Sequence, residues 1–182
     1  YPSSRVFSFE PSRETFCLLE VEFAAMSQVF KLNYGLGVKS QSQLLYKEGQ
    51  YARIASLTPL DVIDPDYTEK VIIRTLDEVV SEYSISEIDL LKIDVEGHEL
   101  DVIKGAQNTL SLRKIKFLQF ELGGASIETN TTLKDIYDVL SKYDYRIYLI
   151  SRHGIVPLDT YDYQFEQYST TNFFAELREK SV

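Results

Sequence analysis

The chain has 182 residues, a net charge of −9 and a single cysteine, Cys17. This length fits one domain, residues 1–182, with a substantial hydrophobic core. The acidic balance argues against an extended basic surface for nucleic acid, and no apolar run approaches the ~20 residues needed to cross a membrane. One cysteine rules out an intrachain disulfide and a cysteine-based zinc site, so a reducing, cytoplasmic location is expected.

The first third of the chain predicts a strand, a helix and a second strand. Residues Arg5–Phe9 have the pattern of a strand, and Ser12 is a plausible N-cap for the helix that follows. Apolar residues at helical spacing predict an inward face made of Phe16, Leu19, Phe23 and Met26. The second predicted strand is Val29–Leu32.

The pattern weakens from Lys39 to Lys70. Pro59 and Pro65 interrupt regular elements, and a hairpin is possible around Glu48-Gly49. We expect 56–66 to be an irregular connection or lid. A short strand is predicted at Val71–Arg74. A helix from Leu76 to Tyr83 follows, because Thr75 and Glu78 have the T-x-x-E spacing of a capping box at its start.

The stretch Ile88–Ala106 is the most informative part of the chain. Its apolar run Ile88–Ile93 predicts a strand buried on both faces. A polar turn follows, and then a helix whose inward stripe is predicted to contain Leu100, Ile103, Ala106 and Leu110. In open α/β sheets, ligands bind outside the carboxyl ends of the strands, which is where this turn would lie.

The remaining elements complete an α/β pattern. We expect a strand at Phe117–Leu122, a helix that Thr132 caps, and late strands at Tyr145–Ile150 and Asn172–Leu177. Alternating strands and helices predict a mostly parallel sheet with helices on both faces. The two late strands, joined by a loop, are expected to be an antiparallel pair at one edge.

The turn after the central strand contains three groups that can handle protons: Asp94, Glu96 and His98. His98 would lie at a helix N-terminus, where the helix dipole favours the neutral imidazole that a general base requires. Asp94 and Glu96 are candidates to bind substrate hydroxyls, to orient His98 or to hold a ligand amino group. For each of them a structural role, such as capping or packing, stays open.

Other polar residues carry weaker hypotheses. Glu121 ends the neighbouring strand and can face the same crevice, and His153 lies in a predicted hairpin turn. A divalent metal held by Asp94, Glu121 and His98 is conceivable, but the spacing is not diagnostic and we predict no metal site.

Glu10 directly follows the first predicted strand. A carboxylate in that position of a dinucleotide-type fold accepts hydrogen bonds from ribose hydroxyls, although an acidic residue near a helix N-terminus is also favourable without a ligand. The glycine loop that usually precedes such a carboxylate is not in the chain, since neither Gly35-x-Gly37 nor Gly123-Gly124 has the G-x-G-x-x-G spacing. Either there is no nucleotide site, or the first strand and its loop lie upstream of Tyr1.

Four segments resemble the FkbM-type S-adenosylmethionine-dependent methyltransferases. The longest, RTLDEVVSEY…IDLLKIDVEGHELDVIKGA, covers 74–106. The others are VFSFEPSRETF, NYGLGV and FLQFELG, which together extend the resemblance from Val6 to Gly123.

The resemblance implies a class I, Rossmann-like methyltransferase sheet and S-adenosylmethionine as cofactor. It implies that Glu10 binds the ribose, that the Gly35-Leu36 turn lies near the adenine, and that Asp94, Glu96 and His98 lie beside the methyl donor and acceptor. The expected reaction is O-methylation of a saccharide or another small molecule, with His98 as the base.

Family members carry a strand and a D-x-G-x-x-x-G loop just before the segment that matches V-x-x-F-E-P. We therefore expect an N-terminally truncated catalytic domain that lacks its first strand and, alone, binds S-adenosylmethionine weakly. The alternatives are a non-catalytic α/β binding domain derived from a methyltransferase and, less favoured by the D-x-E-G-H turn, a Rossmann-type oxidoreductase.

Overall fold

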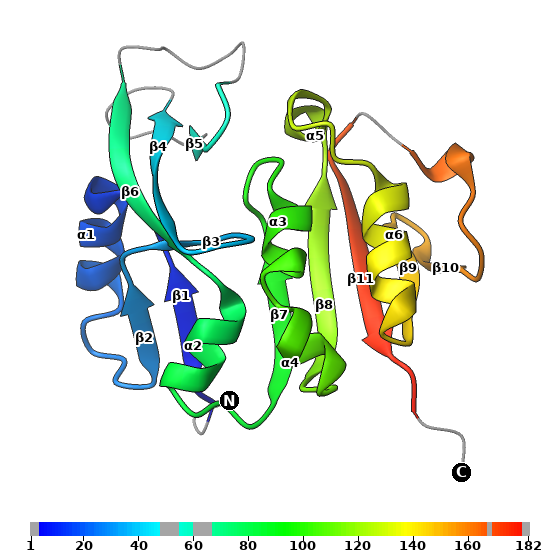
Figure 1. Cartoon of the computed structure of the whole chain (residues 1–182), viewed down its shortest axis with the longest axis horizontal. Helices are drawn as coiled ribbons and strands as arrows, with labels where there is room; N and C mark the ends of the chain where they lie inside the picture. The colour runs from blue at the N-terminus through cyan, green and yellow to red at the C-terminus, as the bar shows by residue number, and fades with distance from the viewer. Residues whose placement is uncertain (1–3, 48–54, 60–66, 167–168, 180–182) are drawn as a thin grey trace.

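The structure is a computed structural model that describes residues 4–47, 55–59, 67–166 and 169–179. The described residues form an α/β fold with three sheets (Figure 1). The strands are β1 (Val6–Phe9), β2 (Val29–Leu32), β3 (Gly35–Leu36), β4 (Gln41–Lys47), β5 (Ala55–Ser56), β6 (Thr68–Arg74), β7 (Ile88–Ile93), β8 (Ile115–Leu122), β9 (Tyr145–Ser151), β10 (Gly154–Leu158) and β11 (Thr171–Leu177). The helices are α1 (Arg13–Glu22), α2 (Leu76–Glu82), α3 (Glu99–Lys104), α4 (Gln107–Ser111), α5 (Gly124–Glu128) and α6 (Leu133–Lys142), with a 3-10 turn at Tyr163–Phe165.

The largest sheet has five strands in the order β10-β9-β11-β8-β7. β7 and β8 run parallel, whereas β11 runs antiparallel to both of its neighbours, β8 and β9. The predicted antiparallel pairing of the two late strands is confirmed. The edge strand, however, is β10, which forms an antiparallel hairpin with β9. This strand was not predicted from the sequence.

The N-terminal part forms two smaller sheets. β1 and β2 pair in parallel, with Val6 opposite Val29. A four-stranded sheet has the order β3-β6-β4-β5, in which β3 and β6 are parallel and the other pairs antiparallel. The sheets are thus mixed, in contrast to the predicted mostly parallel sheet. The hairpin expected around Glu48-Gly49 and most of the expected irregular connection at 56–66 lie outside the described residues.

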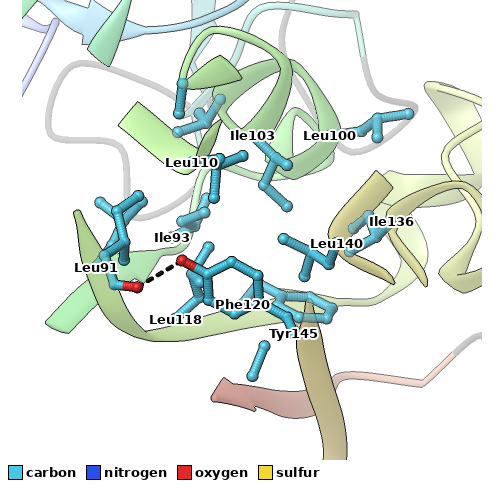
Figure 2. Packing of buried hydrophobic residues seen from close by; sticks show 14 of the residues in the cluster. Leu91, Ile93, Leu100, Ile103, Leu110, Leu118, Phe120, Ile136, Leu140 and Tyr145 are labelled. Carbon is cyan, nitrogen blue, oxygen red and sulfur yellow. Dashed lines mark hydrogen bonds between the residues drawn. The ribbon is translucent and has the colours of Figure 1, made fainter. Parts of the chain in front are cut away.

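The main core lies between the five-stranded sheet and the helices α3, α4 and α6 (Figure 2). All four residues of the predicted inward stripe are buried, and Ile103 and Leu110 are 0% exposed. Leu133, Ile136 and Leu140 of α6 are equally buried. Thr132 caps α6 as predicted, because its side chain accepts a hydrogen bond from Asp135 N and its own N–H donates to the Asp135 carboxylate.

Two predictions about burial are wrong. β7 is buried on one face only: Leu91 and Ile93 are buried, whereas Leu90 is 55% exposed. The reason is that α3, α4 and α6 lie over the same face of the sheet (Figure 1). Helix α1 has no buried residue, because it packs on a sheet of only two strands.

The helix expected after His98 is two helices. α3 ends at Lys104, Gly105 is its C-cap, and α4 begins at Gln107. A Cβ atom on Gly105 would lie 2.1 Å from the carbonyl oxygen of Gly37. The glycine therefore allows the end of α3 to approach the loop after β3 closely.

The turn between β7 and α3 has an uncommon backbone. Glu96 and Gly97 both have positive φ, at 51° and 98°. The carboxylate of Glu99, which is 2% exposed, accepts hydrogen bonds through Oε1 from Val95 N at 3.2 Å and Gly97 N at 3.3 Å. Left-handed conformations cost free energy in a non-glycine residue, so these two bonds help to hold Glu96 there.

No helix among the described residues is long and apolar enough to span a membrane.

We predict that Gly105→Ala destabilises the fold by about 1–3 kcal/mol, because the new methyl group would collide with backbone rather than with a flexible side chain. The measurement is the free energy of unfolding in urea. Gly124→Ala is the matched control, since a Cβ atom added there would have no other atom within 4 Å. Equal stability of the two variants would contradict the close approach.

We also predict a pH-dependent effect of Glu99→Gln. Burial raises the pKa of the Glu99 carboxyl above its usual range, against the opposing effect of its hydrogen bonds. The group's contribution to stability is therefore fully present below the unfolded-state pKa and is lost as pH rises through the folded-state pKa. The stability of the wild type relative to Glu99→Gln should fall as pH rises from acidic to neutral, and a pH-independent difference would contradict this.

Candidate functional site

The candidate site lies at one edge of the molecule, where the carboxyl ends of parallel strands meet. β1, β2, β7 and β8 point the same way (Figure 1). Glu10 directly follows β1, and Asp94 directly follows β7. Glu10 and the turn that begins at Asp94 therefore both follow the carboxyl ends of parallel strands, but on two different sheets.

A small cavity of about 50 Å³ lies between the turn after β7 and the start of α5. Four carboxylates line it, those of Asp94, Glu96, Glu99 and Glu121. Gly97 packs so closely against α5 that a Cβ atom would lie 2.6 Å from the carbonyl oxygen of Ala125. The hydroxyl of Thr129 donates to the Gly97 carbonyl at 2.7 Å. The turn and α5 are thus held together around the cavity.

The carboxylates of the cavity are in different electrostatic situations. Burial, together with the charges of Asp94 and Glu121, raises the pKa of Glu96. Asp94 is exposed and forms an ion pair with Lys92 at 2.6 Å. Glu121 accepts a hydrogen bond from Asn172 Nδ2 at 2.9 Å. Burial also raises the pKa of Glu99, so Glu96 and Glu99 are the two cavity carboxylates whose protonated forms are favoured.

His98 is the N-cap residue of α3, as predicted, but it does not line this cavity. Its ring contacts two side chains instead. Nδ1 lies 2.9 Å from Asp101 Oδ2, and Nε2 lies 3.1 Å from Thr58 Oγ1. Its side chain is only 11% exposed.

The residue that orients His98 is therefore Asp101. Asp94 and Glu96, which the sequence analysis considered for this role, make no hydrogen bond to the ring among the described residues. The conceivable metal site fails on the same geometry, because Asp94 and Glu121 line the cavity and His98 does not. No group of three or more His, Cys, Asp or Glu side chains among the described residues is arranged to hold a metal ion. His153 is exposed in the turn between β9 and β10.

The candidate cofactor side is organised around Glu10. Its Oε1 accepts a hydrogen bond from Ser12 N at 2.8 Å, and burial raises the pKa of its carboxyl, opposed by this bond. The Asn33 amide donates to the carbonyls of Glu10 and Pro11 at 2.9 and 3.2 Å. Gly35 lies against Pro11 and Ile73. The structure thus brings Glu10 and Gly35 close together, whereas the Leu36 side chain is buried in the main core.

A larger open depression of about 480 Å³ lies along β9 and β11, away from these residues. Four of its polar side chains are paired with one another: Arg146 with Asp159 at 2.7 Å, and Tyr148 with Glu176 at 3.1 Å. Arg178 and Glu179 also line it, and none of the residues predicted for the site does.

Sequence reasoning missed four residues of the site. Asp101 lies three residues after His98, a spacing that places two side chains on one helix face, so it was within reach. Glu99 has the pattern of an exposed helical glutamate. Thr58, after β5, contacts His98, and Asn33, after β2, contacts Glu10. Both contacts join segments far apart in the sequence, and no pattern of neighbouring residues predicts them.

The comparisons with known proteins concern the family and the fold. The family model described as "Methyltransferase FkbM domain" matches residues 2–147. The hexuronic acid methyltransferase AglP of Haloferax volcanii is 32% identical over 140 residues, which are 76% of this chain and 54% of that protein. The chain thus spans about half the length of this curated relative.

A solved structure, methyltransferase FkbM from Methylobacillus flagellatus, is similar with a TM-score of 0.53. The similarity covers 94% of this chain and 36% of that one, at 19% identity, and so concerns the fold. The family match extends over the elements that carry Glu10, Gly35 and the D-x-E-G-H turn. This chain belongs to the methyltransferase FkbM domain family.

Proposed function

We propose that the protein is an S-adenosylmethionine-dependent O-methyltransferase that acts on a saccharide hydroxyl. The observation that carries the proposal is the turn from Asp94 to His98. It follows β7, its Gly97 packs against α5, and it lies at the carboxyl ends of the parallel strands, as Glu10 does. The family match and the named activity of AglP support the same reaction class.

The residues on the cofactor side fit this cofactor. The ribose presents two hydroxyl donors, and a carboxylate after a strand can accept both. Ser12 N–H binds Oε1 of Glu10, and no hydrogen bond among the described residues reaches Oε2. S-Adenosylmethionine, when bound, supplies a methyl group that is already activated by the sulfonium charge. Glu10 and the backbone near Gly35 would hold its adenosine part.

The residues on the acceptor side would position a hydroxyl and remove its proton. Correct placement of two reactants is worth up to roughly 7–11 kcal/mol, and a positioned base contributes roughly 100- to 10,000-fold in rate. We assign the base to His98, whose Nε2 faces the hydroxyl of Thr58. Glu96 and Asp94 line the cavity toward α5, which His98 does not line, and there carboxylate oxygens can accept hydrogen bonds from further sugar hydroxyls.

We further propose that the sheets of this chain are parts of one class I methyltransferase sheet. Among the described residues, β1 pairs only with β2, and β7 pairs only with β8. Among those residues, β1 and β7 therefore each have one unpaired edge, and in Figure 1 they are the strands of the two sheets that face each other, with the same direction. A strand that carries the family's glycine loop would fit between them and would supply the rest of the cofactor site.

We predict that His98→Ala lowers kcat for methyl transfer in the full-length protein by roughly 100-fold or more, because the base is lost, while KM for the acceptor changes little. The measurement is steady-state methyl transfer to a panel of saccharides. His153→Ala is the matched control, since His153 is exposed in a hairpin turn outside the site. Unchanged turnover of His98→Ala would remove His98 from the mechanism.

We predict that the 182-residue chain alone binds S-adenosylhomocysteine weakly or not at all, because the edge between β1 and β7 is open and the glycine loop is not in its sequence. Titration calorimetry measures this directly. Tight binding with one site per chain would sink the proposal of a missing strand, and would leave the proposed reaction intact.

A further inference from the structure

Three side chains form a hydrogen-bonded series beside the turn after β7. Asp101 Oδ2 lies 2.9 Å from Nδ1 of His98, and Nε2 of the same ring lies 3.1 Å from Thr58 Oγ1. The three residues come from α3, its N-cap and the segment after β5. Both ring nitrogens of His98 are thus engaged, and from opposite sides.

The chemistry of the partners decides where the ring proton lies. An ionised carboxylate only accepts hydrogen bonds, whereas a hydroxyl both donates and accepts. The hydrogen bond from His98 lowers the pKa of Asp101, which therefore stays ionised at neutral pH. Nδ1 must then carry the proton that bonds to Asp101. In the neutral ring, Nε2 is left as the acceptor and takes the hydrogen bond of the Thr58 hydroxyl.

The segment that carries Thr58 is fastened to the turn by further contacts. The Ser56 hydroxyl donates to the Glu96 carbonyl at 3.0 Å, and Thr58 N–H donates to Ser56 Oγ at 3.3 Å. Ser56 is 1% exposed. These contacts therefore hold the segment that carries Thr58 beside the ring of His98.

Two other charged groups of α3 interact with this series. Glu99 interacts electrostatically with His98, and Lys104 with Asp101. Within the part of the chain that the structure describes, neither makes a hydrogen bond to the ring. Asp101 is thus the charged group that can fix the tautomer.

We propose that Asp101 is a positioning residue, which keeps the proton on Nδ1 of His98 and so makes Nε2 the atom that accepts the proton of the methyl acceptor's hydroxyl. The part of this inference that concerns the reaction rests on the proposed function. In that step the acceptor's hydroxyl takes the place of the Thr58 hydroxyl as the donor to Nε2, its O–H bond breaks, and its proton moves to Nε2. The oxygen electron pair forms the new bond to the methyl carbon, and the pair of the broken C–S bond stays on sulfur.

The tautomer can be measured without any substrate. The chain has two histidines, so a ¹⁵N–¹H correlation spectrum of the imidazole nitrogens at a pH where the rings are neutral contains two sets of signals. His153, which is exposed, serves as the internal reference. We expect the wild type to show His98 protonated at Nδ1.

Three variants test the cause of this tautomer. Asp101→Asn offers an N–H donor to Nδ1, and Asp101→Ala removes the partner. Both should lower the fraction of His98 that is protonated at Nδ1. Thr58→Val should leave that fraction unchanged, because Asp101 remains. An unchanged tautomer in both Asp101 variants, or its loss in Thr58→Val, would overturn the inference.

The effect on the reaction is a separate measurement in the full-length protein. Asp101→Asn should lower kcat by roughly 10-fold or more with little change in KM, and by no more than His98→Ala does. Asp138→Asn is the matched control, since this exposed aspartate of α6 pairs with Lys134, outside the site. Full activity of Asp101→Asn, where His98→Ala is impaired, would contradict the positioning role. If His98→Ala itself is fully active, the assignment of the base fails, and the tautomer measurement still decides the role of Asp101.

Discussion

The hydrogen bonds from Val95 and Gly97 to the buried carboxylate of Glu99 are the constraint on which the candidate site depends. They close a turn in which Glu96 and Gly97 both have positive φ. Because of this backbone, neighbouring side chains diverge: Glu96 lines the cavity toward α5, and His98 contacts Thr58 and Asp101. The hydrogen bonds to the Glu99 carboxylate thus hold a turn in which Glu96 and His98, two residues apart, have different surroundings.

This arrangement is electrostatically costly. The Oε2 atom of Glu99 is buried without a hydrogen-bond partner among the described residues, and burial raises the pKa of both Glu99 and Glu96. Buried polar groups without partners are uncommon in stable folds, and perturbed carboxylates cluster at functional sites. The cost is understandable if the turn is selected for its geometry rather than for stability, which agrees with a role in binding and proton transfer.

The two halves of the candidate site are supported in different ways. The turn from Asp94 to His98 rests on β7 of the five-stranded sheet and on the main core, in which Ile93, Leu100 and Ile103 are all buried. The candidate cofactor side, around Glu10, rests on a two-stranded sheet and on helix α1, which has no buried residue. The close approach of Gly105 to Gly37 is one of the contacts that connect the two halves. A strand between β1 and β7 would join them further.

Local side-chain chemistry was enough to predict several of the elements and the neighbourhood of the site. The bounds of β7, the caps at Thr75 and Thr132 and the inward stripe of α3 and α4 followed from periodicity and capping, which act within a few residues. The D-x-E-G-H turn could be placed at a strand end for the same reason.

The partners of those residues, in contrast, were set by contacts between distant elements. The exposure of Leu90 depends on which face the helices cover, and the division into three mixed sheets depends on pairing between distant strands. Thr58 meets His98 across 40 positions of the chain. Such contacts arise from how whole elements pack against one another, and the pattern of neighbouring residues along the chain carries no record of that packing.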